Sequence, residues 1–314
     1  MPTASEPASV EEAAAALREA AAAGRRVSIE REGGDVVLST ARLDRILEHE
    51  AGDLTCVVEA GVRLSALQAR LAEHGQLLAL DPPGDPTIGA CLAGSLSGPW
   101  RHRYGTMRDL VIGVTVVLAD GTIASSGGKV VKNVAGYDLG KLFHGSRGTL
   151  GLVARVALRL HPRPERRRTL AVPVGGPDDA QRLAQAVLHS DLVPSAVDLL
   201  WGGGAPAILA LRFEGTTRAV DDQLARAAAM LDGAEAGDPL WGQALARQGA
   251  AGGSISFPPG ELGRRLASLG EAVVRVGDGV AYVPGPVESP LPEPVRRLEQ
   301  RVRGQFDPQG VLVA

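Results

Sequence analysis

The sequence predicts an α+β protein with a two-lobed domain over residues 1–163 and a smaller α+β cap domain over residues 164–314. In the first part, short apolar runs of strand length alternate with stretches of helical periodicity, as in packed lobes of helix and sheet. A break rich in proline and arginine at residues 161–168 marks the boundary. We expect the two lobes to span about residues 9–75 and 76–163.

The first lobe is expected to begin with a helix. Residues 1–9 read as a frayed tail, and Ser9 is a suitable N-cap for an alanine-rich helix that runs to Ala23 and ends at Gly24. A second helix over Leu64–His74 carries leucines on one face. The strands expected between these helices are Val27–Ile29, Val36–Leu38 and Cys56–Ala60.

The second lobe is expected to contain a buried strand and a hairpin turn. Leu110–Leu118 is almost entirely apolar, and Ala119–Thr122 contains the Asp-Gly pair of a tight turn. Val153–Leu160 alternates, with arginines on one side, which predicts a half-exposed strand.

The cap follows a basic run, His161–Arg168, that we interpret as a solvated linker. A strand, a helix, a strand and a helix come next, and a last helix over about Pro294–Gly304 is expected to return to the first domain. The elements predicted in the cap are Thr169–Val174, Asp178–Ser190, Ala207–Phe213 and Thr217–Leu231.

Composition excludes several classes of protein. A net charge of −3 gives no global reason to expect nucleic acid or an anionic membrane surface. The two cysteines, Cys56 and Cys91, are too few for an iron–sulfur cluster or a four-thiolate zinc site, although one disulfide stays possible. No apolar run approaches the length of a membrane span and no secretory leader is evident, so we expect a cytoplasmic protein without membrane insertion. No metal site is expected.

Small residues gather between Asp81 and Leu160 where a backbone would lie against a flat, phosphate-bearing ligand. A pyrophosphate needs free backbone N–H groups without an intervening Cβ, which Gly89, Gly94 and Gly98 can supply. Hydroxyl groups in the same segment add donors. The pattern favours a flavin dinucleotide and therefore redox chemistry.

Four motifs together carry a resemblance to a known family: Thr87-Ile88-Gly89, Tyr104-Gly105, Lys132–Leu139 and Gly148–Gly151. Combined, they resemble the PCMH-type FAD-binding domain of the vanillyl-alcohol oxidase superfamily, and in particular the E-type FAD-binding subunit of bacterial glycolate oxidase. The similarity covers most of residues 9–163 and returns weakly near the C-terminus.

The resemblance implies non-covalently bound FAD and a set of binding residues. The segment from Thr87 to Gly98 would follow the flavin and its phosphates, Tyr104 would lie near the isoalloxazine ring, and the backbone of Val153 would meet the adenine. The implied cofactor-binding residues are Gly33, Gly34, Pro83, Thr87, Ile88, Gly89, Ala90, Gly94, Ser95, Ser97, Gly98, Tyr104, Gly105, Thr106 and Val153.

Purely structural alternatives stay open for several of these residues. Gly89 and Gly98 also suit ordinary tight turns, and Tyr104 also suits a packed core position. Lys132 is equally consistent with a phosphate contact and with a solvent-facing position. For Tyr137 and Asp138 a structural role, bracing the following helix, is the favoured interpretation.

One departure from the family weakens the cofactor prediction. The family carries an earlier glycine-rich phosphate loop, whereas the corresponding stretch here keeps only Gly33 and Gly34 and adds Glu30, Glu32 and Asp35. A carboxylate about 4 Å from a phosphate charge is repulsive by roughly 1 kcal/mol in a water-like dielectric and by more when buried. The second loop reads Gly-Ala in place of the usual Gly-Gly, a milder change.

The sequence does not assign catalytic residues. His189, the one histidine in the cap, is expected at the surface of a helix, while His102 is the more interesting candidate beside the flavin motifs. The resemblance implies that the substrate is a small 2-hydroxy acid such as glycolate or lactate, with a second flavoprotein subunit and an iron–sulfur subunit as partners. Two alternatives stay open: a flavin-free homologue acting as a structural or regulatory subunit, and a stand-alone flavin oxidase or dehydrogenase.

Overall fold

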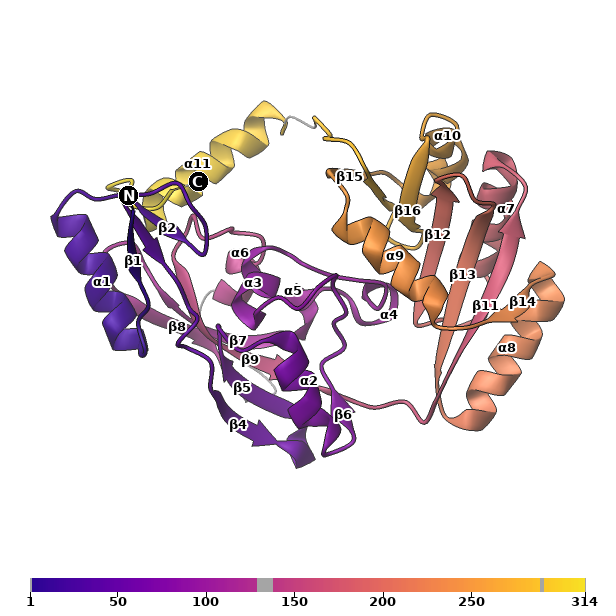
Figure 1. The fold of residues 1–314 in the computed structure, drawn as a ribbon, viewed down its shortest axis with the longest axis horizontal. Helices are drawn as coiled ribbons and strands as arrows, with labels where there is room; N and C mark the ends of the chain where they lie inside the picture. The colour runs from indigo at the N-terminus through magenta and orange to yellow at the C-terminus, as the bar shows by residue number, and fades with distance from the viewer. Residues whose placement is uncertain (1, 129–137, 289–290, 314) are drawn as a thin grey trace.

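The computed structural model describes residues 2–128, 138–288 and 291–313. Two bodies lie side by side, one holding the N-terminal part of the chain and the C-terminal helix, the other holding the cap (Figure 1).

The first body contains a small parallel sheet beside helix α1 (Val10–Ala22). Ser9 caps this helix through a hydrogen bond from the Glu12 N–H to its side chain, as expected. The sheet has the order β1–β3–β2, and Val27 also pairs with Leu312, so the C-terminal segment extends it. The predicted frayed tail is wrong over Thr3–Ser5, since these residues pair with β3 and cover its edge. The strands are β1 (Thr3–Ser5), β2 (Val27–Ile29) and β3 (Val36–Leu38).

A five-stranded antiparallel sheet forms the rest of the first body, in the order β4–β5–β9–β7–β8. We expected the lobes to span residues 9–75 and 76–163, but β5 from the first range pairs with β9 from the second. One sheet therefore contains strands from both ranges, and the lobes do not divide at residue 75. The prediction of a half-exposed β9 is wrong, since pairing on both sides buries it and exposes only Arg159. The strands are β4 (Ile46–Glu50), β5 (Thr55–Glu59), β7 (Val111–Val117), β8 (Ile123–Gly127) and β9 (Leu152–Arg159).

Short helices and a strand pair connect these strands and cover the sheet. Leucines of α2 and α3 pack against the sheet in one core with Phe143 of α6. A short 3-10 turn, η1, joins β4 to β5, and β6 pairs with β10. These elements are η1 (Ala51–Asp53), α2 (Leu64–Ala72), β6 (Gln76–Leu77), α3 (Ile88–Ala93), α4 (Arg101–Tyr104), α5 (Met107–Leu110), α6 (Leu139–Phe143) and β10 (His161–Pro162).

The cap is a seven-stranded antiparallel sheet, in the order β14–β11–β13–β12–β16–β17–β15. The basic run is not wholly a linker, because Arg166, Arg167 and Arg168 begin strand β11 and form ion pairs with cap carboxylates. The strands are β11 (Arg166–Val174), β12 (Ala196–Gly202), β13 (Ala207–Gly215), β14 (Ala234–Ala236), β15 (Gly253–Ser256), β16 (Glu271–Arg275) and β17 (Val280–Val283).

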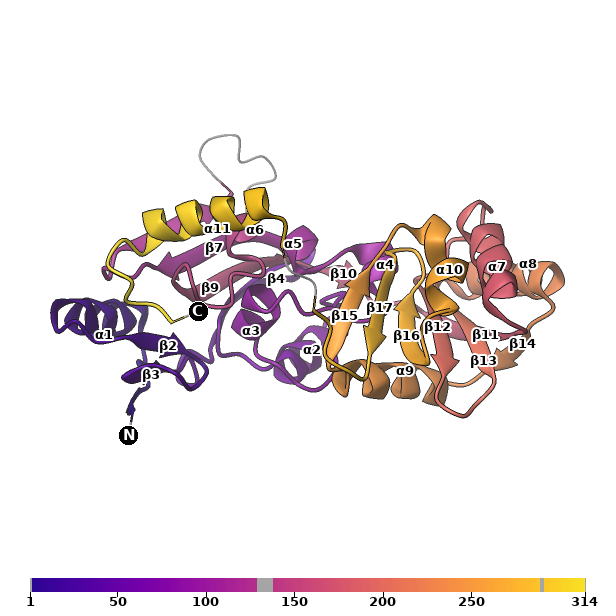
Figure 2. The ribbon, with the colours of Figure 1, turned by 90° about the horizontal axis from the view of Figure 1, so that it is seen from above.

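Helices cover both faces of the cap sheet. α7, α8 and α10 pack on one face around Leu199 and Leu211, and α9 packs on the other through Trp241 (Figure 2). The last helix, α11, lies along the first body, where Phe306 contacts Phe143 with ring centroids 5.9 Å apart. These elements are α7 (Pro177–Leu188), α8 (Thr217–Leu231), α9 (Pro239–Gly249), η2 (Pro259–Glu261), α10 (Leu262–Leu266) and α11 (Glu293–Phe306).

Candidate functional site

A pocket of about 330 Å³ lies between the small parallel sheet and helix α3, and we call it the interlobe pocket. Four of the predicted cofactor residues line it: Gly89, Ala90, Gly94 and Val153. The structure therefore brings together residues from the α3 segment and from β9 that are about sixty positions apart in sequence. Its other lining residues are Ile29, Glu30, Arg31, Thr40, Ala93, Leu96, Arg147, Gly148, Gly151 and Leu152.

The acidic loop contributes one carboxylate to this pocket. Glu30 has a left-handed backbone, with φ of 57°, and its carboxylate accepts hydrogen bonds from the Thr40 N–H, the Thr40 hydroxyl and the Ser39 hydroxyl. Asp35 is turned elsewhere, accepting a hydrogen bond from the Arg26 N–H. The carboxylate nearest to the pocket is thus held by three donors of the same lobe.

Two arginines also line the interlobe pocket, and the sequence analysis missed both. The Arg31 Nη2 donates to the Val313 carbonyl at 2.6 Å, while its Nε is buried and has no hydrogen-bond partner among the residues that the structure describes. Arg147 comes from the glycine string after α6. A sequence signal existed, because each arginine stands inside a loop already singled out for its glycines.

A second pocket, of about 380 Å³, lies between the first body and the cap, and we call it the cap pocket. It is lined by Pro83, a predicted cofactor residue, and by cap side chains that include Gln248, Ser254 and Tyr282. Leu96 lines both pockets, so they adjoin each other. One pocket lies between the lobes and the other lies under the cap, and Leu96 is the lining residue that they share.

This arrangement fits an extended, anionic dinucleotide. The interlobe end offers a buried, unpaired guanidinium N–H of Arg31 together with the guanidinium of Arg147, the donor type that binds phosphate groups best. The cap end offers neutral polar groups around an open space. Charge at one end and neutral polarity at the other match the phosphate and ring ends of a flavin dinucleotide.

Four predicted glycines lie against neighbouring protein atoms rather than open space, and a Cβ on one of them, Gly94, would lie 2.8 Å from the Ala90 carbonyl oxygen. A Cβ on Gly89 would approach the Ala60 Cβ to 2.8 Å, and the Gly89 N–H already donates to the Ala60 carbonyl. A Cβ on Gly98 would lie 1.7 Å from the Asp81 carbonyl oxygen, and one on Gly34 would lie 2.7 Å from the Arg26 carbonyl oxygen. Close packing within the protein therefore explains the absence of side chains at these positions. Gly33, with φ of 130°, belongs to the same short turn as Gly34.

Two predicted hydroxyl residues of this segment, Thr87 and Ser97, have partners within the protein. Thr87 caps α3, where its hydroxyl accepts a hydrogen bond from the Ala90 N–H, and Ile88 is fully buried in the core. Ser97 is buried, and its hydroxyl accepts from the Arg101 guanidinium. Ser95 is exposed and has φ of 54°.

The Tyr104–Thr106 segment forms the end of α4 and the start of α5. The Tyr104 ring makes an edge contact with His161, with centroids 4.8 Å apart. Gly105 has φ of 79°, and Thr106 caps α5 in a capping box with Asp109. None of these three residues lines the interlobe pocket or the cap pocket.

Three of the six histidines, His102, His144 and His189, occupy different environments. His102 is packed against Gly277 of the cap, and burial lowers its pKa while the nearby Asp278 opposes that shift. Burial and the neighbouring Arg108 lower the pKa of His144. His189 is exposed at the end of α7, as expected. The described residues that line the two pockets include no histidine.

The Lys132–Tyr137 part of the third motif lies outside the described residues. Asp138, which follows it, caps α6 by accepting a hydrogen bond from the Lys141 N–H at 3.1 Å. The structural role expected for Asp138 is therefore confirmed.

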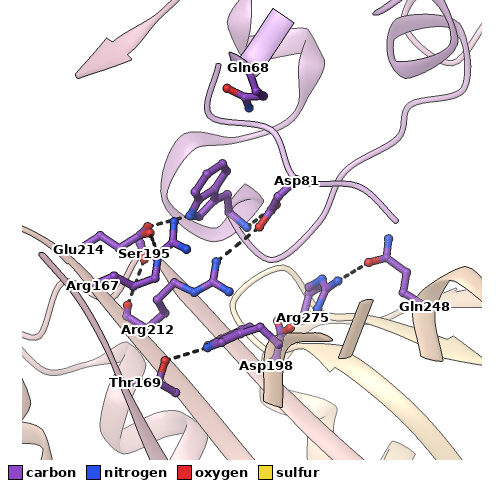
Figure 3. A network of polar contacts seen from close by, with 12 residues as sticks. Gln68, Asp81, Arg167, Thr169, Ser195, Asp198, Arg212, Glu214, Gln248 and Arg275 are labelled. Carbon is purple, nitrogen blue, oxygen red and sulfur yellow. Dashed lines mark hydrogen bonds and ion pairs between the residues drawn. The ribbon is translucent and has the colours of Figure 1, made fainter. Parts of the chain in front are cut away.

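A network of buried charges joins the first body to the cap beside the cap pocket (Figure 3). The Asp81 carboxylate faces Arg212 of β13, and Asp198 of β12 pairs with Arg275 of β16. Arg275 also donates to the Gln248 side chain, whose own amide donates to the Ser97 carbonyl at 2.7 Å. We call these residues the interdomain network. Through Asp81 and Ser97, which lie near Pro83 and Leu96 in the sequence, the network connects the first body to the cap.

A second branch of contacts continues from Trp100. Its indole N–H donates to the Glu214 carboxylate at 2.7 Å, and its backbone N–H donates to Asp81 at 3.0 Å. Arg167 pairs with the same Glu214, and its guanidinium lies 5.6 Å from the Trp100 ring centroid. Trp100 thereby links the first body to the strands β11 and β13 of the cap.

A larger cavity, of about 690 Å³, lies between α2 and the segment that leads into β11. Gln68, Trp100 and Arg163 are among its lining residues, and none of the predicted cofactor residues lines it. Size alone therefore does not mark the site, because the predicted residues converge elsewhere.

The described parts of the chain contain no group of three or more His, Cys, Asp or Glu side chains that would hold a metal ion. They also contain no helix of the length and apolarity needed to cross a membrane.

Comparisons with known proteins point in the same direction. A family model described as "FAD binding domain" matches residues 3–127. The mitochondrial D-lactate dehydrogenase [cytochrome] of Kluyveromyces lactis is 35% identical over 54% of this chain and 30% of its own length. The glycolate oxidase subunit GlcD of Bacillus subtilis is 36% identical over 54% of this chain and 36% of its own length. The chain therefore spans about a third of the length of these relatives.

Among solved structures, an alkyldihydroxyacetonephosphate synthase superposes with a TM-score of 0.74, covering 98% of this chain and 75% of that one. The identity is 15%, so the likeness shows the fold. Because almost the whole chain is covered, the shared fold includes the cap as well as the first body.

Proposed function

We propose that this chain is an FAD-dependent oxidoreductase subunit for a small 2-hydroxy acid such as glycolate or lactate, because residues 3–127 match the "FAD binding domain" model and the chain is similar to D-lactate dehydrogenases and to a glycolate oxidase subunit. The observation that carries the proposal is the pair of pockets, interlobe and cap, that share Leu96 as a lining residue and hold five of the predicted cofactor residues between them. Bound FAD supplies a two-electron acceptor for the hydride at C2 of such an acid.

The residues of this chain position the two ends of the cofactor. In the interlobe pocket, Arg31, Arg147 and the small residues around Gly94 would hold the phosphate-bearing half. In the cap pocket, Pro83 would lie against the ring, and Gln248 and Ser254 would offer neutral hydrogen-bonding groups at its edge. The interdomain network would keep the cap closed over this end and exclude water.

The lining of the cap pocket favours electron relay over an independent catalytic role. Proton removal from the substrate hydroxyl needs a base, and recognition of its carboxylate needs a cation. The described side chains around the cap pocket include neither a histidine nor a charged group. We therefore propose that a second flavoprotein subunit and an iron–sulfur subunit complete the machinery. A cytoplasmic location stays a prediction.

The proposal is tested first by the visible absorption spectrum of the purified chain before and after incubation with FAD, with unbound FAD removed. We expect flavin bands, and partial bleaching when D-lactate or glycolate is added without oxygen in the presence of the partner subunits. Leu96→Trp should prevent flavin retention, because the larger side chain fills the junction of the two pockets. Leu298→Trp is the matched control, since Leu298 is 59% exposed on α11.

A flavin-free structural or regulatory subunit is the second candidate function. The Glu30 carboxylate supports it, because a negative charge lines the pocket that would receive the phosphates. A chain that stays colourless after incubation with FAD, while still assembling with its partner subunits, would contradict the first proposal and favour this one.

A further inference from the structure

The inference concerns how a diphosphate can be held when the first glycine loop is short and acidic, and it rests on the proposed function. Two guanidinium groups line the interlobe pocket, and they come from loops more than a hundred positions apart in sequence. Arg31 belongs to the acidic loop between β2 and β3, whereas Arg147 belongs to the turn between α6 and β9. The fold alone brings them to one cavity.

Arg31 is anchored at one end and unsatisfied at the other. Its Nη2 donates to the Val313 carbonyl at 2.6 Å, which fixes the guanidinium against the C-terminal segment. Its Nε is buried and, within the described chain, meets no acceptor. A buried charged donor without a partner is unfavourable. Arg31 also lines the interlobe pocket, where a phosphate would accept a charge-assisted hydrogen bond from its guanidinium.

Arg147 is held at its backbone while its side chain stays available. The Arg147 N–H donates to the Ala93 carbonyl at 2.9 Å, which joins this turn to the end of α3. The Arg147 side chain forms no ion pair with any residue that the structure describes. The guanidinium is therefore free to accept an anionic partner in the pocket.

The one carboxylate that lines the pocket does not neutralise either arginine. Glu30 accepts its hydrogen bonds from Thr40 and Ser39. Two cations against one occupied carboxylate leave the pocket with an excess of positive charge. This excess is what an incoming diphosphate needs once backbone N–H groups of a glycine loop are missing.

We propose that Arg31 and Arg147 bind the diphosphate of the dinucleotide, in place of the glycine loop that the acidic segment has lost. Recognition then depends on side-chain charge rather than on backbone N–H groups. The negative charge of Glu30 repels the diphosphate and therefore lowers the affinity of the pocket for the dinucleotide. These arginines would therefore recognise the ADP half of FAD. ADP and riboflavin can each be tested alone, so binding of this half can be measured separately from binding of the flavin ring.

The test measures dissociation constants of FAD, ADP and riboflavin for the full chain by titration calorimetry and flavin fluorescence at fixed salt. We expect Arg31→Gln and Arg147→Gln each to weaken FAD and ADP binding by about tenfold or more, and to leave riboflavin binding unchanged. Arg264→Gln is the matched control, because Arg264 is an 80% exposed arginine on α10 of the cap. Glu30→Gln should strengthen FAD and ADP binding several-fold, since it removes the opposing charge and keeps an acceptor for Thr40.

Several outcomes would overturn the inference. If both arginine variants bind FAD and ADP like the wild type, the inference fails and the proposed function stands. If Arg31→Gln lowers the melting temperature without ligand but leaves ADP affinity unchanged, Arg31 serves only to hold the C-terminal segment. If the wild-type chain binds neither FAD nor ADP, both the inference and the proposed cofactor are contradicted.

Discussion

The Asp81 carboxylate and the Arg212 guanidinium meet across the junction between the first body and the cap, with Oδ2 and Nη1 3.6 Å apart. Arg212 is further held over the Trp241 ring, 4.1 Å from its centroid, and Asp81 accepts a hydrogen bond from the Trp100 N–H. The pair connects the loop before Pro82 to the central part of the cap sheet. Changes at this junction should therefore affect stability and cofactor binding together.

The first prediction concerns pH and Asp81. Burial raises the pKa of Asp81 to about 7, although Trp100, Arg212 and Arg275 favour its charged form and Asp198 opposes it. The unfolded chain releases this proton near pH 4, so between about pH 4 and 7 the folded state holds more protons. The contribution of Asp81 to stability is therefore present in acid and is lost as the pH rises toward 7.

This prediction is checked by urea unfolding of the wild type and Asp81→Asn between pH 4.5 and 7.5. The free energy of unfolding of the wild type should fall more steeply with rising pH than that of the variant. Subtracting the two profiles removes the carboxylates that both proteins share. Parallel profiles would show that Asp81 titrates normally in the folded protein.

The second prediction concerns the buried pair Asp198–Arg275. The two side chains are 0% and 1% exposed, so removing one leaves the other charge buried without its partner. Arg275→Met should lower the free energy of unfolding by about 3–5 kcal/mol. Adding Asp198→Asn should recover part of that loss, because no uncompensated charge then remains. A double-mutant cycle by chemical denaturation measures the coupling, and additive losses would contradict a direct pair.

The third prediction concerns close packing at Gly98. A Cβ there would lie 1.7 Å from the Asp81 carbonyl oxygen, so the loop that carries Asp81 must move. Gly98→Ala should reduce the free energy of unfolding by at least about 1–3 kcal/mol. Gly52→Ala is the control, because nothing lies within 4 Å of its Cβ position, and its effect should stay within about 0.5 kcal/mol. Equal stability of the two variants would argue against the close approach.

The fourth prediction concerns the two thiols. Cys56 and Cys91 are free and buried, and burial raises the pKa of each to about 12. Because the thiolate is the reactive form, neither should react with a thiol-specific reagent at pH 8 while the protein is folded. Both should react at once in denaturant. Rapid labelling of either cysteine in the native protein would show that its surroundings open to solvent.

Local signals in the sequence were sufficient for many individual elements. The helix after Ser9 follows from a capping residue and a run of strong helix formers, and the structure places it at Val10–Ala22. The apolar run before the Asp-Gly turn likewise becomes β7. The resemblance to FAD-binding proteins also came from short motifs, since each motif is contiguous in the chain.

Sheet membership and site geometry were decided by the tertiary structure. Pairing of β5 with β9 and burial of β9 depend on contacts between residues far apart in sequence, which no local periodicity encodes. The surroundings of Gly89 and Gly98 also depend on distant contacts. As glycines they suit a phosphate loop, but in the fold they pack against Ala60 and Asp81.

The sequence by itself determined the type of domain, several of its helices and strands, and the region where a dinucleotide is expected, because these depend on local propensity and contiguous motifs. Only the tertiary structure placed Arg31 beside Arg147 and added Gln248 of the cap to the site. The charge and shape of a cavity depend on side chains from loops that are distant in sequence and come together only when the chain folds. Local sequence patterns do not show which loops, far apart in the chain, will meet in one cavity.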